Sequence, residues 1–201
     1  MSTTGVLSRL SYSKCICDNG RRCTCSRHAD SRTGTEVFAV VADGALYVVF
    51  RGTDQWRDWA FNLRSSLAPW GGPGRVHRGV LAKYNSVRPW VLARARSHGG
   101  PLRATGHSVG GALACLFAAD PCLQDRGVEV TTFGAPKVGD AAFALGAERV
   151  APGAVRVASP LDPVPRFPLR CGYAHFGTPV RVWFLGHRAE LYERAAAGGG
   201  S

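Results

Sequence analysis

Short apolar runs predict a set of buried strands along the chain. Glu36–Asp43 and Ala45–Phe50 are rich in Val, Phe, Tyr and Ala, and the Asp43-Gly44 step between them favours a tight turn. These two runs therefore predict an antiparallel hairpin. Four further runs predict short buried strands over Leu102–Gly106, Val128–Phe133, Ala154–Ala158 and Val180–Leu185.

Helical spacing of apolar residues appears between these runs. The first such segment is Val80–Arg96, in which Pro89 is expected to bend or split the helix. Three more helices are predicted over Val109–Ala119, Asp140–Glu148 and His187–Ala197. Strands that alternate with helices indicate the α/β class. We expect a mostly parallel central sheet with an N-terminal antiparallel hairpin and with helices on both faces.

Length and composition fit one folded domain between less regular ends. Of the 201 residues, 45% are apolar and 19% charged, which allows a sizeable core and excludes wholesale disorder. We expect residues 1–34 to be a cysteine-rich irregular leader, residues 35–194 the α/β domain, and residues 195–201 a flexible tail. The chain shows neither an apolar run of the ~20 residues needed to span a membrane nor the apolar segment of a secretory signal, so a cytoplasmic location is the default expectation.

The net charge of +11 raises the question of an anionic partner. A field of this sign attracts nucleic acid, anionic lipid headgroups or acidic substrates. The arginines are scattered, however, and no dense basic run of the kind found in nucleic-acid arms is present. We therefore expect an arginine-rich solvated surface and no nucleic-acid partner, and charge gives no indication of the oligomeric state.

Four of the seven cysteines form a cluster: Cys15, Cys17, Cys23 and Cys25. Two CxC pairs with His28 just beyond them could clasp a tetrahedral zinc ion, pair as disulfides, or remain free. The spacing leaves these alternatives open, so no metal site is assigned. Cys115 and Cys122 lie in and just after an apolar helical pattern, and we expect both to be small buried hydrophobes.

Ser108 is the candidate nucleophile. It stands at the centre of Gly106-x-Ser108-x-Gly110, directly after a predicted strand and directly before a predicted helix. The flanking glycines avoid collisions between the neighbouring strand and helix at such a turn. The positive end of the helix dipole also favours the negative charge that develops on an acyl oxygen. The alternative interpretation, a turn of small residues, explains the glycines but not this placement between strand and helix.

A serine nucleophile needs a base and an orienting carboxylate, and in this type of fold they follow it in the order Ser, Asp, His. Asp162 follows a predicted strand in a proline-rich loop. Two histidines lie beyond it, His175 and His187. We assign His187 as the base because it follows the last predicted strand and opens the last predicted helix. His175 precedes that strand and is expected to be structural.

Several motifs together resemble the class 3, fungal-type lipase family of α/β hydrolases. They occur in the family's order from about Glu36 to Tyr192 and are VVFRGTD (Val48–Asp54), VHRGVLAKY (Val76–Tyr84), GHSVGGALA (Gly106–Ala114), TFGAPKVGD (Thr132–Asp140), VASPLDPVPRFP (Val157–Pro168), GYAHFG (Gly172–Gly177) and HRAELY (His187–Tyr192). The resemblance implies an α/β-hydrolase fold. It also implies a serine carboxylic-ester hydrolase, with Ser108 as nucleophile, Asp162 as acid and His187 as base.

The resemblance further implies an oxyanion hole made by Thr53 and by the backbone N–H of Val109. It also implies that a lid lies between Thr53 and Val76, and we weigh a moving lid over Asp54–Gly74 equally against a segment that packs permanently on the core. No cofactor is implied. The implied substrate is a triacylglycerol or related lipid ester, with possible transient contact with an anionic lipid surface.

Rival hypotheses remain open at this point. The 25 residues between Asp162 and His187 leave little room for an insertion and predict a compact cleft. A short-chain or feruloyl-type esterase, or a polyester hydrolase, would suit such a cleft. A catalytically silent lipase-like interaction protein is a further alternative, although the intact Ser, Asp and His argue against it.

Overall fold

The computed structural model describes residues 24–52, 66–169 and 172–198. In this part of the chain a seven-stranded sheet has the order β1-β2-β3-β6-β7-β8-β9. The first three strands pair antiparallel, and β3, β6, β7, β8 and β9 run parallel. This arrangement confirms the predicted mostly parallel sheet with its N-terminal hairpin. The strands are β1 (Thr24–Asp30), β2 (Thr35–Ala42), β3 (Ala45–Phe50), β6 (Leu102–His107), β7 (Val128–Phe133), β8 (Val155–Ala158) and β9 (Thr178–Arg181).

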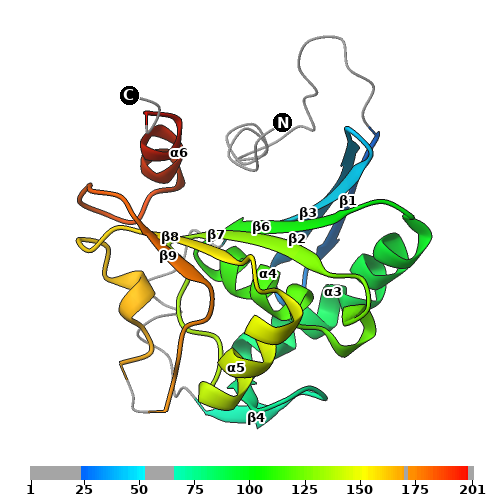
Figure 1. Cartoon of the computed structure of the whole chain (residues 1–201), viewed down its shortest axis with the longest axis horizontal. Helices are drawn as coiled ribbons and strands as arrows, with labels where there is room; N and C mark the ends of the chain where they lie inside the picture. The colour runs from blue at the N-terminus through cyan, green and yellow to red at the C-terminus, as the bar shows by residue number, and fades with distance from the viewer. Residues whose placement is uncertain (1–23, 53–65, 170–171, 199–201) are drawn as a thin grey trace.

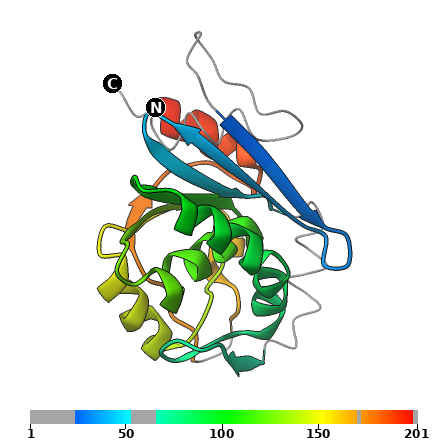
Figure 2. The same ribbon diagram turned by 90° about the vertical axis from the view of Figure 1, so that its right-hand side faces the viewer.

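Helices cover both faces of the sheet, as predicted. On one face lie α3 (Arg78–Ser97), α4 (Val109–Ala118) and α5 (Ala141–Val150), and on the opposite face lies α6 (Ala189–Gly198) (Figures 1 and 2). Two short 3₁₀ helices are η1 (Pro121–Leu123) and η2 (Val164–Arg166). Within the described residues, no helix has both the length and the apolar character that crossing a bilayer demands.

The core forms where α3 and α4 meet the sheet. Alternate residues of β3 point to opposite faces, so that Val48 and Phe50 join the main core while Tyr47 and Val49 pack on the other face. All ten residues of α4 are buried, and its Phe117 contacts Phe50 at a ring separation of 6.0 Å. A helix buried on all sides gives its N-terminus a fixed place at the end of β6.

The structure differs from the expected irregular leader at Thr24–Asp30, which forms the edge strand β1. Two of its exposed residues, Thr24 and Arg27, are polar because an edge strand covers the core from one side only. This polarity conceals the strand in the sequence. The chain then turns into β2, where Asp30 accepts hydrogen bonds from the backbone N–H (3.0 Å) and the hydroxyl (2.6 Å) of Thr33.

Three local details differ from expectation. The helix α3 is not split at Pro89 but continues through it, and Pro89 lies on its exposed side, where water can solvate the carbonyl of Asn85 that loses its partner. The last strand, β9, is shorter than Val180–Leu185 and all of its residues are exposed, because it is the sheet edge. Cys122 is exposed in η1, whereas Cys115 is buried as expected.

Two segments that the sequence left open are partly described. Of the clustered cysteines, Cys15, Cys17 and Cys23 lie outside the described residues, and Cys25 is disulfide-bonded. No group of three or more His, Cys, Asp or Glu side chains that could hold a metal ion occurs where the structure is described. Most of the lid candidate also falls outside. Its described end forms a hairpin of β4 (Leu67–Pro69) and β5 (Arg75–His77), in which residues 71–74 form the turn.

Candidate active site

Ser108 sits in a strained turn between β6 and α4. Its backbone has φ 58° and ψ −129°, a left-handed conformation that non-glycine residues rarely adopt. The turn is held by the Ser108 N–H, which donates to the Phe133 carbonyl on the neighbouring strand (2.9 Å). The backbone of β3 also approaches the turn closely, since a Cβ atom at Gly110 would lie only 2.2 Å from the Phe50 carbonyl oxygen. Local sterics therefore fix the glycine and project the serine from the strand end.

Asp162 and His187 form a buried pair at the same edge of the sheet. Asp162 lies in the loop after β8, and His187 lies in the segment between β9 and α6. The His187 Nδ1–H donates to Asp162 Oδ2 over 2.6 Å. The two residues are only 1% and 7% exposed, respectively. In a neutral imidazole this bond leaves Nε2 as the proton acceptor, which is the arrangement a general base requires.

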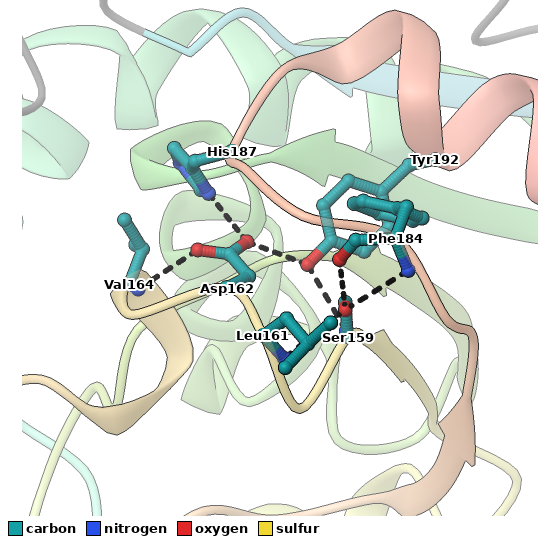
Figure 3. A network of polar contacts seen from close by, with 7 residues as sticks. All are labelled: Ser159, Leu161, Asp162, Val164, Phe184, His187 and Tyr192. Atoms are coloured by element: carbon teal, nitrogen blue, oxygen red, sulfur yellow. Dashed lines mark hydrogen bonds and ion pairs between the residues drawn. The ribbon is translucent and has the colours of Figure 1, made fainter.

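Two further donors complete the environment of the Asp162 carboxylate (Figure 3). The Val164 N–H donates to Oδ1 (2.9 Å), and the Tyr192 hydroxyl donates to Oδ2 (2.6 Å). Burial, followed by the hydrogen bond to Asp162, raises the pKa of Tyr192, so the phenol stays protonated and remains a donor. With His187, three donors satisfy a carboxylate that would otherwise be costly to bury.

The Tyr192 ring is itself fixed by edge-to-face packing. Phe184 contacts it at a ring separation of 4.6 Å and an interplanar angle of 88°, and Phe133 contacts it at 6.3 Å and 75°. Its hydroxyl also accepts from the backbone N–H of Ser159 (3.3 Å), at the start of the loop that carries Asp162. Tyr192 therefore links α6 to the Asp162 carboxylate, so the place of this helix helps to fix the place of the carboxylate.

His107 joins the serine to the acid–base pair. It directly precedes Ser108, and its ring lies 4.5 Å from the His187 ring at an interplanar angle of 31°. Burial, followed by the proximity of His187, lowers the pKa of His107 to about 3. A neutral His107 adds no positive charge next to the His187 ring, so it does not oppose a proton on that ring.

The structure brings some predicted site residues together and leaves others apart. Asp162 and His187 are joined directly, and the His187 ring lies beside that of His107, the residue before Ser108. The Ser108 hydroxyl is buried but has no hydrogen-bond partner among the described residues, so the Ser108–His187 hydrogen bond is not formed here. Val109 opens α4, where backbone N–H groups have no acceptor within the helix. Thr53 lies outside the described residues.

The two candidate histidines occupy different positions. His187 is bonded to Asp162, whereas the His175 Nε2–H donates to the Pro165 carbonyl (2.7 Å). We expected His187 to open the last helix, but α6 begins at Ala189, two residues later. Sequence reasoning missed Tyr192 and His107 as parts of the site. The only signal for them was their place in motifs that also contain His187 and Ser108.

Known proteins share this arrangement of strands and motifs. Lipase from Rhizomucor miehei is 32% identical over 157 residues, which cover 69% of this chain and 43% of the relative. Secreted mono- and diacylglycerol lipase 2 from Gibberella zeae is 36% identical over 179 residues, covering 71% of this chain and 44% of the relative. The chain thus spans less than half of these curated relatives.

A solved structure and a family match complete the comparison. The structure of lipase II from Rhizopus niveus superposes with a TM-score of 0.68 and 27% identity, covering 81% of this chain and 66% of that one. This likeness confirms the predicted α/β-hydrolase fold class. The family described as Lipase (class 3) matches residues 47–171, a segment that begins within β3 and includes the Ser108 turn and the loop of Asp162. Since this segment is more than half of the 201 residues, the chain belongs to the class 3 lipase family.

Proposed function

We propose that the protein is a serine carboxylic-ester hydrolase that acts on lipid esters. The observation that carries the proposal is the buried 2.6 Å pair of His187 and Asp162 beside a strained serine at the N-terminus of α4. In this assignment Ser108 is the nucleophile, His187 the general base and Asp162 the group that orients the base. His187 lies beyond the family match, so its role depends on this geometry.

The reaction proceeds through an acyl-enzyme. Ser108 Oγ attacks the ester carbonyl carbon and transfers its proton to His187 Nε2, while Asp162 stabilises the resulting imidazolium. The tetrahedral intermediate collapses when the carbon–oxygen bond to the alcohol breaks and His187 returns the proton to that alcohol. Water then attacks the acyl-enzyme with the same histidine as base, which releases the acid and restores Ser108. The Ser108–His187 hydrogen bond, which is not formed in this structure, is proposed to form when substrate binds.

The oxyanion hole is proposed on the N-terminus of α4 and on Thr53. The Val109 N–H lies at the positive end of the helix dipole, directly after the nucleophile. Thr53 follows Gly52, which approaches the turn so closely that a Cβ atom there would lie 2.7 Å from the His107 carbonyl oxygen and 3.5 Å from Ser108 Cβ. This approach supports a donor from Thr53 to the same oxyanion.

Acylglycerols are the proposed substrate class, in line with the Gibberella zeae relative, which is a mono- and diacylglycerol lipase. Labelling with a fluorophosphonate tests the nucleophile. We expect label on Ser108, and none on the buried Ser159, whose hydroxyl is bonded to the Phe184 carbonyl (2.6 Å). A failure of Ser108 to react would instead support a catalytically silent lipase-like protein. A panel of p-nitrophenyl esters and emulsified acylglycerols tests the substrate, and a maximum at acetyl or butyryl esters would favour a short-chain esterase.

Contact with an anionic lipid surface is proposed through exposed apolar residues beside the acid–base pair. Leu161, Trp183 and Leu185, here called the rim patch, are 50%, 73% and 79% exposed. The two segments that carry them are linked by hydrogen bonds: the Leu161 N–H donates to Ser159 Oγ (3.2 Å), and this hydroxyl donates to the carbonyl of Phe184, the residue between Trp183 and Leu185. Three large, exposed apolar side chains are more stable in contact with a lipid surface than in water.

Charge selects the kind of interface. Between residues 160 and 189 the one acidic residue of the sequence is the buried Asp162, whereas Arg166, Arg181 and Arg188 are exposed. At roughly 1 kcal/mol per arginine near an anionic surface, we expect phosphatidylglycerol vesicles to bind on the order of 10²-fold more tightly than phosphatidylcholine vesicles. W183S should weaken this binding, whereas L145S, at an exposed leucine of α5, should not. Equal binding to both vesicles would contradict the proposal.

A further inference from the structure

The loop that presents Asp162 depends on donors from outside itself. This acid loop, residues 159–168, contains four prolines, at positions 160, 163, 165 and 168, and proline has no N–H to donate. Some of its carbonyls are bonded within the loop, such as that of Val164, which accepts from the Phe167 N–H (3.0 Å), but others are bonded from other segments. The His175 Nε2–H donates to Pro165 (2.7 Å), and the backbone N–H of Lys137 donates to Phe167 (2.8 Å). The shape of the acid loop is therefore set in part by its neighbours.

The Pro165 carbonyl is closely connected to the carboxylate of Asp162. Pro165 directly follows Val164, whose N–H donates to Asp162 Oδ1 (2.9 Å). Both Val164 and Pro165 are buried in η2, so this turn has little freedom to rearrange. A displacement of the Pro165 carbonyl would move the Val164 N–H and, with it, the carboxylate that His187 requires.

His175 itself is anchored to a different part of the fold. The N–H of Ala174 donates to the Gly139 carbonyl (2.8 Å), in the connection between β7 and α5. On its other side, Phe176 is buried and packs edge-to-face on Phe143 of α5 at a ring separation of 6.1 Å. The imidazole thus reaches the acid loop from a backbone held on both sides by other elements.

The surroundings of His175 keep it neutral. Burial, followed by the nearby guanidinium of Arg156 on β8, lowers the pKa of His175 to about 4, and the Lys137 ammonium acts in the same direction. Because a carbonyl can only accept, Nε2 carries the proton of the neutral ring. Its hydrogen bond to Pro165 therefore persists without change across neutral pH.

We propose that His175 is a positioning residue for hydrolysis: its Nε2–H holds the Pro165 carbonyl and so fixes the acid loop in the place where Asp162 meets His187. The proposal rests on the proposed ester hydrolysis. Loss of the donor would loosen the Asp162–His187 bond and destabilise the imidazolium. Turnover should then fall, and the acid limb of the pH profile of kcat/KM should move to lower pH, because a less stabilised imidazolium loses its proton more readily.

Kinetics of H175A and H175Q on a soluble p-nitrophenyl ester test the proposal. Rates are normalised to the sites that a fluorophosphonate titrates, so that misfolded protein does not count. We expect H175A to lower kcat on the order of 10-fold with KM changed by less than about two-fold, since a small misplacement of a catalytic group slows turnover without removing substrate contacts. H175Q, whose amide can donate to Pro165, should recover most of the loss.

The matched control is H98A. His98 Nε2 also contacts a backbone carbonyl, that of Gly44 (3.1 Å). This contact lies before the starts of β3 and β6, at the opposite end of these parallel strands from Ser108, and His98 is likewise neither fully buried nor fully exposed. H98A should leave kcat and the pH profile unchanged. Unchanged kcat per titrated site in H175A would overturn the proposal, as would an H175Q variant no better than H175A.

A spectroscopic measurement separates failure of this proposal from failure of the proposed function. The proton in the short His187–Asp162 hydrogen bond should give a downfield NMR signal in the wild type. We expect this signal to broaden or move upfield in H175A and to return in H175Q, whether or not the protein turns over esters. An identical signal in H175A would overturn the positioning role. Absence of fluorophosphonate labelling in the wild type would refute only the hydrolase.

Discussion

Ser108 stands at one junction, between β6 and α4, whereas Asp162 and His187 stand in two loops that meet only in the folded chain. The serine turn is shaped by neighbouring backbones, such as the Phe50 carbonyl that approaches Gly110. The acid–base pair is shaped by hydrogen bonds between side chains and backbone, from Val164, Tyr192 and His187. The conformation of the serine turn is thus determined by steric exclusion. The acid–base pair depends on hydrogen-bond donors, two of which lie 25 and 30 residues from Asp162 along the chain.

This difference predicts which substitutions each region tolerates. A steric turn tolerates changes of its polar atoms but no added volume. A hydrogen-bonded pair tolerates small changes of volume but not the loss of a donor to a buried carboxylate. The two regions should therefore respond to different substitutions, and they should converge only where the reaction needs them together.

The largest effects are expected from Ser108 and His187, the residues of the two regions that act together in the proposed reaction. S108A and H187A should each lower kcat on the order of 10⁶-fold, because removal of either member of a triad costs nearly as much as removal of both. Turnover of a p-nitrophenyl ester measures the loss, and circular dichroism verifies the fold. Full activity in H187A together with an inactive H175A would show that the base is assigned to the wrong histidine.

The next largest effect should come from volume added to the serine turn. In G110A the new methyl would lie 2.2 Å from the Phe50 carbonyl oxygen, and backbone there cannot move aside. We expect destabilisation by about 1–3 kcal/mol and a loss of turnover on the order of 10²-fold, measured by urea unfolding and ester hydrolysis. G99A is the control, since nothing lies within 4 Å of a Cβ at that position. Equal effects of both substitutions would contradict a steric origin.

The same difference decides what the sequence could reveal. Gly106-x-Ser108-x-Gly110 is readable because strand, turn and helix are adjacent in the chain, and their sterics act locally. Asp162 and His187 were found through chain order and a family resemblance rather than through spacing. The donation from Tyr192 crosses 30 residues to Asp162, so no local pattern contains it.

The fold shows the same limit at its edges. Two central strands, β3 and β7, were predicted with their observed bounds, because β3 is a continuous apolar run and β7 carries the buried Val128, Val130 and Phe133. The edge strands β1 and β9 were missed or misplaced, because only one side of each is paired and their residues are largely exposed. Which strand lies at an edge is a property of the whole sheet, and a short stretch of sequence does not contain it.

A smaller effect is expected from removal of one donor to the carboxylate, and the chain offers a matched control. Tyr192 donates to Asp162 (2.6 Å), and Tyr84 donates in the same way to the buried Asp120 (2.7 Å), which lies at the opposite end of α4 from Ser108. Y192F and Y84F should each lower the free energy of unfolding by about 1–3 kcal/mol. Only Y192F should also lower kcat, on the order of 10-fold. An equal kcat in Y192F and wild type would mean that His187 and Val164 suffice to orient Asp162.

The last effect should appear in the pH dependence of stability, to which each region contributes one neutral histidine. Burial lowers the pKa of His107, at the serine turn, to about 3 and that of His175, beside the acid loop, to about 4. An unfolded chain protonates histidine near pH 6.5, so it binds more protons than the folded chain below that pH. The free energy of unfolding should therefore be largest above about pH 6.5 and should fall on acidification, by at most about 1.4 kcal/mol per pH unit for each histidine.

Urea unfolding of H107Q and H175Q at a series of fixed pH values measures the contribution of each histidine to this fall. H175Q should flatten the curve only down to about pH 4 and H107Q down to about pH 3, and a slope unchanged in H107Q would show that the serine turn does not hold its histidine in the neutral form.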